Sequence, residues 1–132
     1  MEKIIHESGK RKRAIARATL KKGTGKVTIN KINIDYHEPK LARLRIKEPL
    51  LLAGEFSDKI DVNINVFGGG FMSQADAARL AVARVLTKHN QSLKKVFLEY
   101  DRQLLVADVR RKESSKPNRH GQARAKRQKS YR

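Results

Sequence analysis

The chain has 132 residues and a formal net charge of +18, from 31 Lys and Arg against 13 Asp and Glu. It contains no cysteine, which excludes a disulfide framework, a thiolate metal site and a cysteine nucleophile. The length suits one domain, no apolar run approaches the roughly 20 residues of a membrane-spanning helix, and the first ten residues lack the apolar stretch of a secretory signal.

The first half of the chain is predicted to be mainly strands. The expected strands are residues 3–6, 14–20, 26–30, 32–36 and 60–66. The last is the clearest, because apolar and polar residues alternate strictly, as in a half-buried strand. Residues 40–46 and 49–53 are typical of two short helices, with Pro49 in the first turn of the second.

The second half begins with three glycines and the clearest predicted helix. Ser73 is the expected N-cap of that helix, and apolar residues from Ala75 to Leu86 recur at helical spacing. A further helix is predicted over 93–100, and 104–107 is an apolar run that suits a strand or a helix end. We therefore expect one α+β domain, with a sheet of about four strands and helices on one face.

Half of the excess charge lies in the last 23 residues. Residues 1–109 and residues 110–132 each carry a net charge of +9, and the second segment has no Leu, Ile, Val, Phe or Met. Such a segment cannot bury apolar surface and is not expected to fold alone. We interpret 1–109 as a globular body and 110–132 as an extended basic tail.

So much charge on a small body favours a polyanionic partner, and nucleic acid fits better than an anionic membrane. Neutralised phosphates release counterions, whereas membrane binding needs large apolar anchors that the basic tail lacks. The run from Gly9 to Arg13 suits phosphate contacts, and the shared parity of Arg11, Arg13 and Arg17 predicts that they line one face of a strand.

Gly68-Gly69-Gly70 precedes the long helix, where free N–H groups and the helix dipole favour a phosphate. The simpler interpretation is a tight strand-to-helix turn. The spacing does not match a dinucleotide-binding fingerprint, and Gly23-Thr24-Gly25-Lys26 does not match a nucleotide phosphate loop because Val27 follows the lysine. We interpret the latter as a hairpin turn.

Metal binding and catalysis have little support. The four histidines are His6, His37, His89 and His120, and none is paired at metal-ligand spacing. The acidic residues are scattered, with nothing to pair them with a base or nucleophile. We expect no cofactor, no metal site and no enzymatic activity.

Three ordered motifs resemble the family of small-subunit ribosomal protein nine. They are the segment 9–30, the segment 68–84 with its Gly-Gly-Gly-Phe-Met-Ser-Gln-Ala core, and Asp108, Arg110 and Glu113 followed by the ending Gln-Lys-Ser-Tyr-Arg. The ending is similar to that of archaeal and eukaryotic members. Ser73 departs from the usual glycine, and Ser114-Ser115-Lys116 from a common Pro-Lys-Lys run.

The resemblance implies a domain like the C-terminal domain of small-subunit ribosomal protein five. It also implies a place in the head of the small ribosomal subunit in the cytoplasm, bound to ribosomal RNA beside neighbouring head proteins, with no membrane contact. No homo-oligomer is expected. The tail is expected to approach peptidyl-site transfer RNA through Arg127, Lys129 and Arg132. The predicted ribosomal RNA contacts are Lys10, Arg11, Lys12, Arg13, Arg17, Gly68, Gly69, Gly70, Arg84, Arg110, Arg111, Lys112, Lys116, Arg119, Arg124 and Lys126.

Two other functions remain open at this point. A free-standing nucleic-acid compaction protein would bind DNA and structured RNA alike and would not associate with ribosomes in fixed proportion. An RNA-processing enzyme would lose activity when His37 or His120 is changed.

Overall fold

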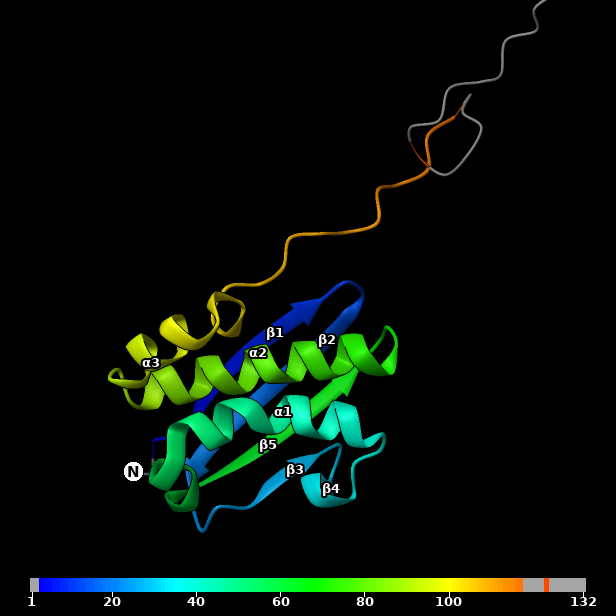
Figure 1. The fold of residues 1–132 in the computed structure, drawn as a ribbon. Coiled ribbons are helices and arrows are strands. Elements are labelled where there is room, and N and C mark those ends of the chain that lie inside the picture. The colour runs from blue at the N-terminus through cyan, green and yellow to red at the C-terminus, as the bar shows by residue number, and fades with distance from the viewer. Residues whose placement is uncertain (1–2, 118–122, 124–132) are drawn as a thin grey trace, which may run out of the picture.

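A computed structural model describes residues 3–117 and 123 (Figure 1). Five strands form one mixed sheet in the order β1-β2-β5-β3-β4, one strand more than expected. Every neighbouring pair is antiparallel except β3 with β5. The strands are β1 (Ile5–Arg11), β2 (Ala14–Lys22), β3 (Val27–Ile29), β4 (Ile32–Asn33) and β5 (Ile60–Phe67).

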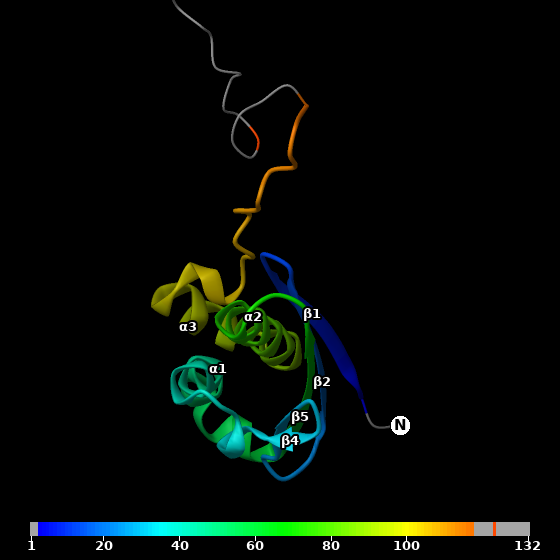
Figure 2. The same cartoon turned by 90° about the vertical axis from the view of Figure 1, so that its right-hand side faces the viewer.

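Three α-helices lie on one side of the sheet, which confirms the predicted α+β class (Figure 2). They are α1 (Lys40–Ala53), α2 (Phe71–His89) and α3 (Leu93–Tyr100). Short 3-10 turns cover Ile34–Tyr36, Gly54–Lys59 and Arg102–Leu104. Within residues 3–117 and 123, no helix is both long enough and apolar enough to cross a bilayer.

The core lies between the sheet and the helices. Alternate residues of β2 and β5 point into it, and α2 is buried nearly all round because the sheet covers one side and α1 and α3 pack against it. Phe97 of α3, Ile46 of α1 and Ile64 of β5 are among the largest fully buried side chains. Each contributes roughly 1.5–3 kcal/mol through burial.

Two helix boundaries differ from the predictions. Residues 40–53 form one helix instead of two, with Pro49 inside it. Pro49 is buried beside Ile46 and Leu50, and this packing offsets the hydrogen bond that proline cannot donate. The N-cap of α2 is Gly70, not Ser73, and the N–H of Gln74 donates to the Gly70 carbonyl at 2.9 Å.

Two strands also differ in length. β1 runs to Arg11, beyond the predicted 3–6, and so includes much of the basic run. The predicted strand 32–36 ends at Asn33, whose side chain accepts a hydrogen bond from the N–H of Asp35 at 3.0 Å and starts a 3-10 turn. The apolar run 104–107, expected to be a strand or a helix end, begins at the last residue of a 3-10 turn over Arg102–Leu104 and forms no strand.

Candidate nucleic-acid interface

The turn between β1 and β2 carries two cations at one end of the molecule. Lys12 and Arg13 occupy the turn, and Lys12 has a φ of 53°. The prediction that Arg11, Arg13 and Arg17 share one face is wrong. Arg11 pairs with Ala14 on the buried face, whereas Arg17 pairs with Asn65 on the open face. Because Arg11 pairs with Ala14, the odd-numbered residues of β1 and the even-numbered residues of β2 lie on the same face of the sheet.

The glycine turn packs against this hairpin. Gly68 and Gly69 have φ values of 75° and 64°, which side chains rarely adopt. A Cβ on Gly68 would lie 2.7 Å from the carbonyl oxygen of Arg13, and one on Gly69 would lie 3.0 Å from the N of Ala14. These two glycines therefore serve a tight turn that fits against the protein's own backbone.

Gly70 differs from its two neighbours. A Cβ there would meet nothing within 4 Å. No side chain caps the N-terminus of α2, and the first turn of α2 has no acidic residue. The first N–H groups of α2 therefore have no side-chain acceptor among the described residues and are open to water or a partner, and the helix dipole favours an anion there.

Asp108 holds the tail base, which we define as residues 108–111, against the body. Its Oδ2 lies 2.9 Å from Nη1 of Arg11 and 2.7 Å from Nη2 of Arg110, and its Oδ1 accepts the N–H of Arg110 at 3.0 Å. The hydrogen bonds from Arg110, with help from Arg11, hold the pKa of the Asp108 carboxyl well below its ordinary value of 3.8. Arg111 adds a second attachment, because its Nη1 donates to the carbonyl of Lys12.

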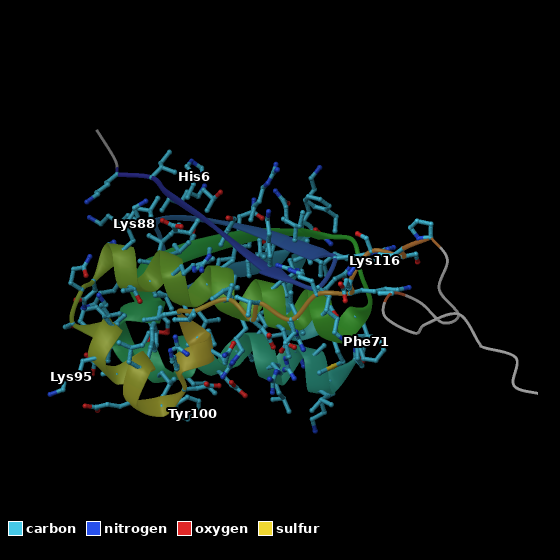
Figure 3. The ribbon with its side chains drawn as sticks, turned by 90° about the horizontal axis from the view of Figure 1, so that it is seen from above. His6, Phe71, Lys88, Lys95, Tyr100 and Lys116 are labelled. Carbon is cyan, nitrogen blue, oxygen red and sulfur yellow. The ribbon has the colours of Figure 1, made fainter. Side chains whose placement is uncertain are left out.

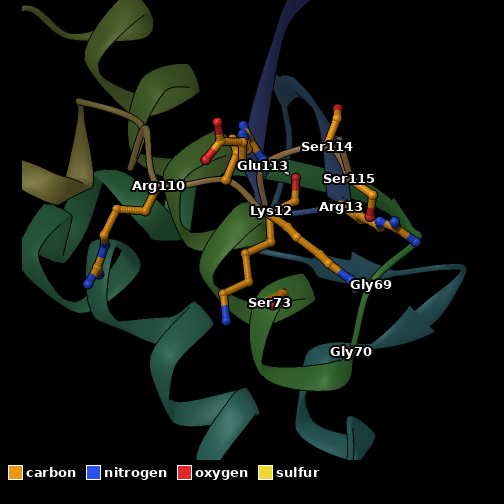
Figure 4. Close-up of a pocket in the computed structure, with 11 residues that line it drawn as sticks. Lys12, Arg13, Gly69, Gly70, Ser73, Arg110, Glu113, Ser114 and Ser115 are labelled. Carbon is orange, nitrogen blue, oxygen red and sulfur yellow. Dashed lines mark hydrogen bonds between the residues drawn. The ribbon is translucent and has the colours of Figure 1, made fainter. Parts of the chain in front are cut away.

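These three segments enclose an open groove of ≈ 750 Å³ (Figure 4). It lies at the end where the tail leaves the body, near Phe71 and Lys116 (Figure 3). Five of its lining residues are cationic and one is acidic, so a polyanion fits its charge. The lining residues are Lys12, Arg13, Gly69, Gly70, Ser73, Arg110, Arg111, Lys112, Glu113, Ser114 and Ser115.

Several predicted contact residues bind other parts of the protein. Arg11 is only 18% exposed and pairs with Asp108. Arg84 donates to the carbonyls of Ser8 at 2.8 Å and Leu105 at 3.3 Å. Lys116 pairs with Glu113. By contrast, the Arg110 side chain, which lines the groove, is 79% exposed despite its bond to Asp108.

Further predicted contacts either do not line the groove or lie outside the described residues. Lys10 and Arg17 are exposed on β1 and β2, away from the lining of the groove. The remaining predictions lie outside the described residues: Arg119, Arg124, Lys126, Arg127, Lys129 and Arg132. Among residues 3–117 and 123, no three His, Asp or Glu side chains gather as a metal site would require.

Sequence reasoning missed the ion pairs that connect α2 to α1 and to Asp101, the residue that follows α3. Arg79 is 5% exposed and pairs with Glu48 at 2.6 Å and Asp101 at 3.1 Å. Arg45 pairs with Asp76 at 2.6 Å. Arg79 falls on the apolar stripe of α2, four residues after Ala75, and an arginine in that position signals a buried ion pair.

The first prediction concerns Asp108→Asn. The amide cannot pair with both arginines, so the tail base should detach and trypsin should cut after Arg110 and Arg111 several-fold faster. The melting temperature should change little.

The lowered pKa of Asp108 also predicts how the native chain responds to acid. It stabilises the folded state at every pH above 3.8, so the native tail base should open only in stronger acid.

Time-resolved mass spectrometry of the tryptic fragments measures this effect. Asp58→Asn is the matched control, because Asp58 forms no ion pair in the part of the chain that the structure describes. Equal cleavage rates in the Asp108 variant and the native chain would contradict the attachment.

The open sheet face, the cation-lined groove and the basic C-terminal sequence define a small α+β protein whose charge suits a polyanion. The family model described as ribosomal protein S9/S16 matches residues 9–132, and the chain belongs to that family. It is 50% identical to small ribosomal subunit protein uS9 of Methanococcus maripaludis strain C7, over 98% of this chain and 99% of that protein. It is 48% identical to the protein of the same name from Methanococcus vannielii, with the same coverage.

Proposed function

We propose that this protein is a structural component of the small ribosomal subunit that binds ribosomal RNA in the subunit head and performs no bond chemistry. The observation that carries the proposal is the groove. There the β1–β2 turn, the uncapped N-terminus of α2 and the tail base bring together five cations and one carboxylate. Phosphate oxygens accept from such lysine, arginine and helix N–H donors. Membership of a ribosomal protein family supports the same function.

In this proposal the tail continues from the groove into the RNA. Asp108 and Arg111 attach the tail base to β1 and to the hairpin turn, so the following residues leave the body from the basic end. The cations after Lys116 then neutralise phosphates along the path. Arg127, Lys129 and Arg132 reach the peptidyl-site transfer RNA, and neighbouring head proteins contact the body in the ribosome of the cytoplasm.

Sedimentation tests the ribosomal part of this function. A cell lysate is separated at high salt, and the chain is detected with an antibody. We expect one copy with each small subunit. Release into all nucleic-acid fractions would instead support the compaction protein, which needs no fixed stoichiometry.

The second prediction concerns the end of the tail. Removal of residues 127–132 deletes three cations, Arg127, Lys129 and Arg132, and none of the groove residues. Small subunits that carry the truncated chain should therefore assemble normally but bind peptidyl-site transfer RNA several-fold more weakly, because phosphate contacts are lost.

Filter binding of transfer RNA to purified subunits measures this loss. The control is a full-length chain in which Arg127, Lys129 and Arg132 are replaced by glutamine, which keeps the length and removes the charge. It should behave like the truncation. Unchanged transfer RNA affinity in both would refute the proposed tail contact.

A further inference from the structure

The sheet has a second face that no described element covers. All three α-helices lie on one side of it (Figure 2), and His6 projects from the other side, away from Lys95 and Tyr100 (Figure 3). The strand register assigns the residues of this open face, which form cross-strand rows. The rows are Lys10–Ile15–Phe67, Ser8–Arg17–Asn65, His6–Thr19–Asn63–Thr28 and Lys21–Asp61.

The open face is polar and positively charged. Arg17 lies over the ring of Phe67, with its Cζ 5.7 Å from the ring centroid, an arrangement that holds the guanidinium in place. The only acid in the rows is Asp61, and its Oδ1 accepts the N–H groups of Thr24 and Lys26 at 2.9 Å each. Asp61 is thus bonded to backbone N–H groups, and its row lies two rows from that of Arg17.

Amides and hydroxyls fill the space between the cations. Thr28 donates to Asn63 at 3.0 Å, and His6 bonds Thr19 at 2.9 Å, so the row from His6 to Thr28 is already ordered. Asn65 is exposed and has no such partner among the described residues. It borders a hollow of ≈ 490 Å³ with Arg17 and Thr19. Glu7 also borders the hollow, but it pairs with Lys88 at 2.8 Å.

The chemistry of this face selects its partner. The centre of a protein interface is apolar and poor in charge, and the large apolar groups of these rows are only the half-buried Ile15 and the 48%-exposed Phe67. A double-stranded RNA minor groove presents 2′-hydroxyls and base edges between two rows of phosphates. Asparagine and threonine suit the hydroxyls, and Arg17, Lys10 and Lys21 suit the phosphates.

We propose that the open sheet face is a second RNA-binding surface, which takes the minor groove of an RNA double helix around Arg17 and Asn65. The inference rests on the proposed function for the class of partner. It differs from that function in place, because neither Arg17 nor Asn65 lines the groove at the basic end. The protein would thus bind two RNA segments, one at its end and one on its sheet.

The absence of cysteine from the chain allows a direct test. Single cysteines introduced as Asn65→Cys, Ser73→Cys and Gln91→Cys carry an iron chelate that cleaves nearby RNA. They report on the sheet face, the groove and the α2–α3 turn. The probe is the small subunit, reconstituted from ribosomal RNA, the other subunit proteins and each full-length variant.

We expect cleavage of both strands of a paired RNA segment from position 65, cleavage of a different segment from 73, and much weaker cleavage from 91. Cleavage from 73 without cleavage from 65 would overturn the sheet proposal alone, as would cleavage from 65 confined to unpaired RNA or matched by position 91. No cleavage from either 65 or 73 in subunits that contain the chain would overturn both proposals.

A charge variant gives an independent measure. Asn65→Asp keeps the side-chain shape and places a carboxylate opposite Arg17, whereas Gln91→Glu adds the same charge at the α2–α3 turn. The first should weaken binding to deproteinised small-subunit ribosomal RNA about tenfold, since a charge-assisted contact is lost. The second should change it little. Equal effects would mean that only net charge matters, and would overturn the surface.

Discussion

The affinity of the full-length chain for deproteinised small-subunit ribosomal RNA should fall by about three to five decades between 50 and 200 mM salt. This fall corresponds to the neutralisation of roughly 6–10 phosphates, each of which releases counterions. The groove offers five cations and the tail beyond Lys116 offers six more, so the supply of charge is sufficient. Filter binding across a salt series gives the slope of log K against log salt.

One substitution locates part of that slope. Lys12→Gln removes a groove cation that forms no ion pair among the described residues and should reduce the slope by about 1. Lys95→Gln is the control, because Lys95 lies on α3, 3.9 Å from Glu99 and away from the groove. A flat salt response of the native chain would rule out phosphate contacts as the main source of affinity.

Local pattern predicted the elements whose signal is local. The alternation over 60–66 gave β5, and the helical spacing of apolar residues from Ala75 to Leu86 gave α2. Pro49 misled the prediction, because its cost to a helix is local whereas the packing that offsets it is tertiary. The predicted N-terminus of α2 is wrong because serine is the more common N-cap residue. Gly70 is the N-cap here because of the turn that precedes it, which local pattern does not reveal.

The candidate site, like the fold, was predictable only where the signal is local in the sequence. The basic run and the glycines were visible in the sequence, but their assembly was not. Arg111 meets Lys12 across 99 residues of sequence, and Asp108 meets Arg11 across nearly as many. Such pairings depend on strand register, and the register of the β1–β2 hairpin places Arg11 on the helix-covered face of the sheet, opposite to the face of Arg17.

The fold should depend strongly on Gly9, the single glycine of β1. A Cβ there would lie 2.3 Å from the carbonyl oxygen of Ala77 and 2.8 Å from the N of Ala81. Both are backbone atoms of α2, so neither can move without the helix. Gly9→Ala should therefore cost about 3 kcal/mol of unfolding free energy and lower the melting temperature by about 10 °C.

Gly70→Ala is the matched control for Gly9→Ala. Gly70 has a φ of −92°, and its Cβ would meet nothing within 4 Å, so this variant should melt within a few degrees of the native chain. Thermal unfolding followed by circular dichroism compares the two. Equal melting temperatures for both variants would contradict the close packing of β1 on α2.

The same contact connects the fold to the interface. Because Gly9 lets β1 lie directly against α2, the hairpin turn that follows places Lys12 and Arg13 beside the N-terminus of α2. Gly9→Ala should thus lose RNA affinity only as it loses the folded state, with no change in salt slope at temperatures where it remains folded. Lys12→Gln should show the reverse, a smaller slope at an unchanged melting temperature. The two variants therefore separate the packing of β1 on α2, which depends on Gly9, from the proposed phosphate contact of Lys12.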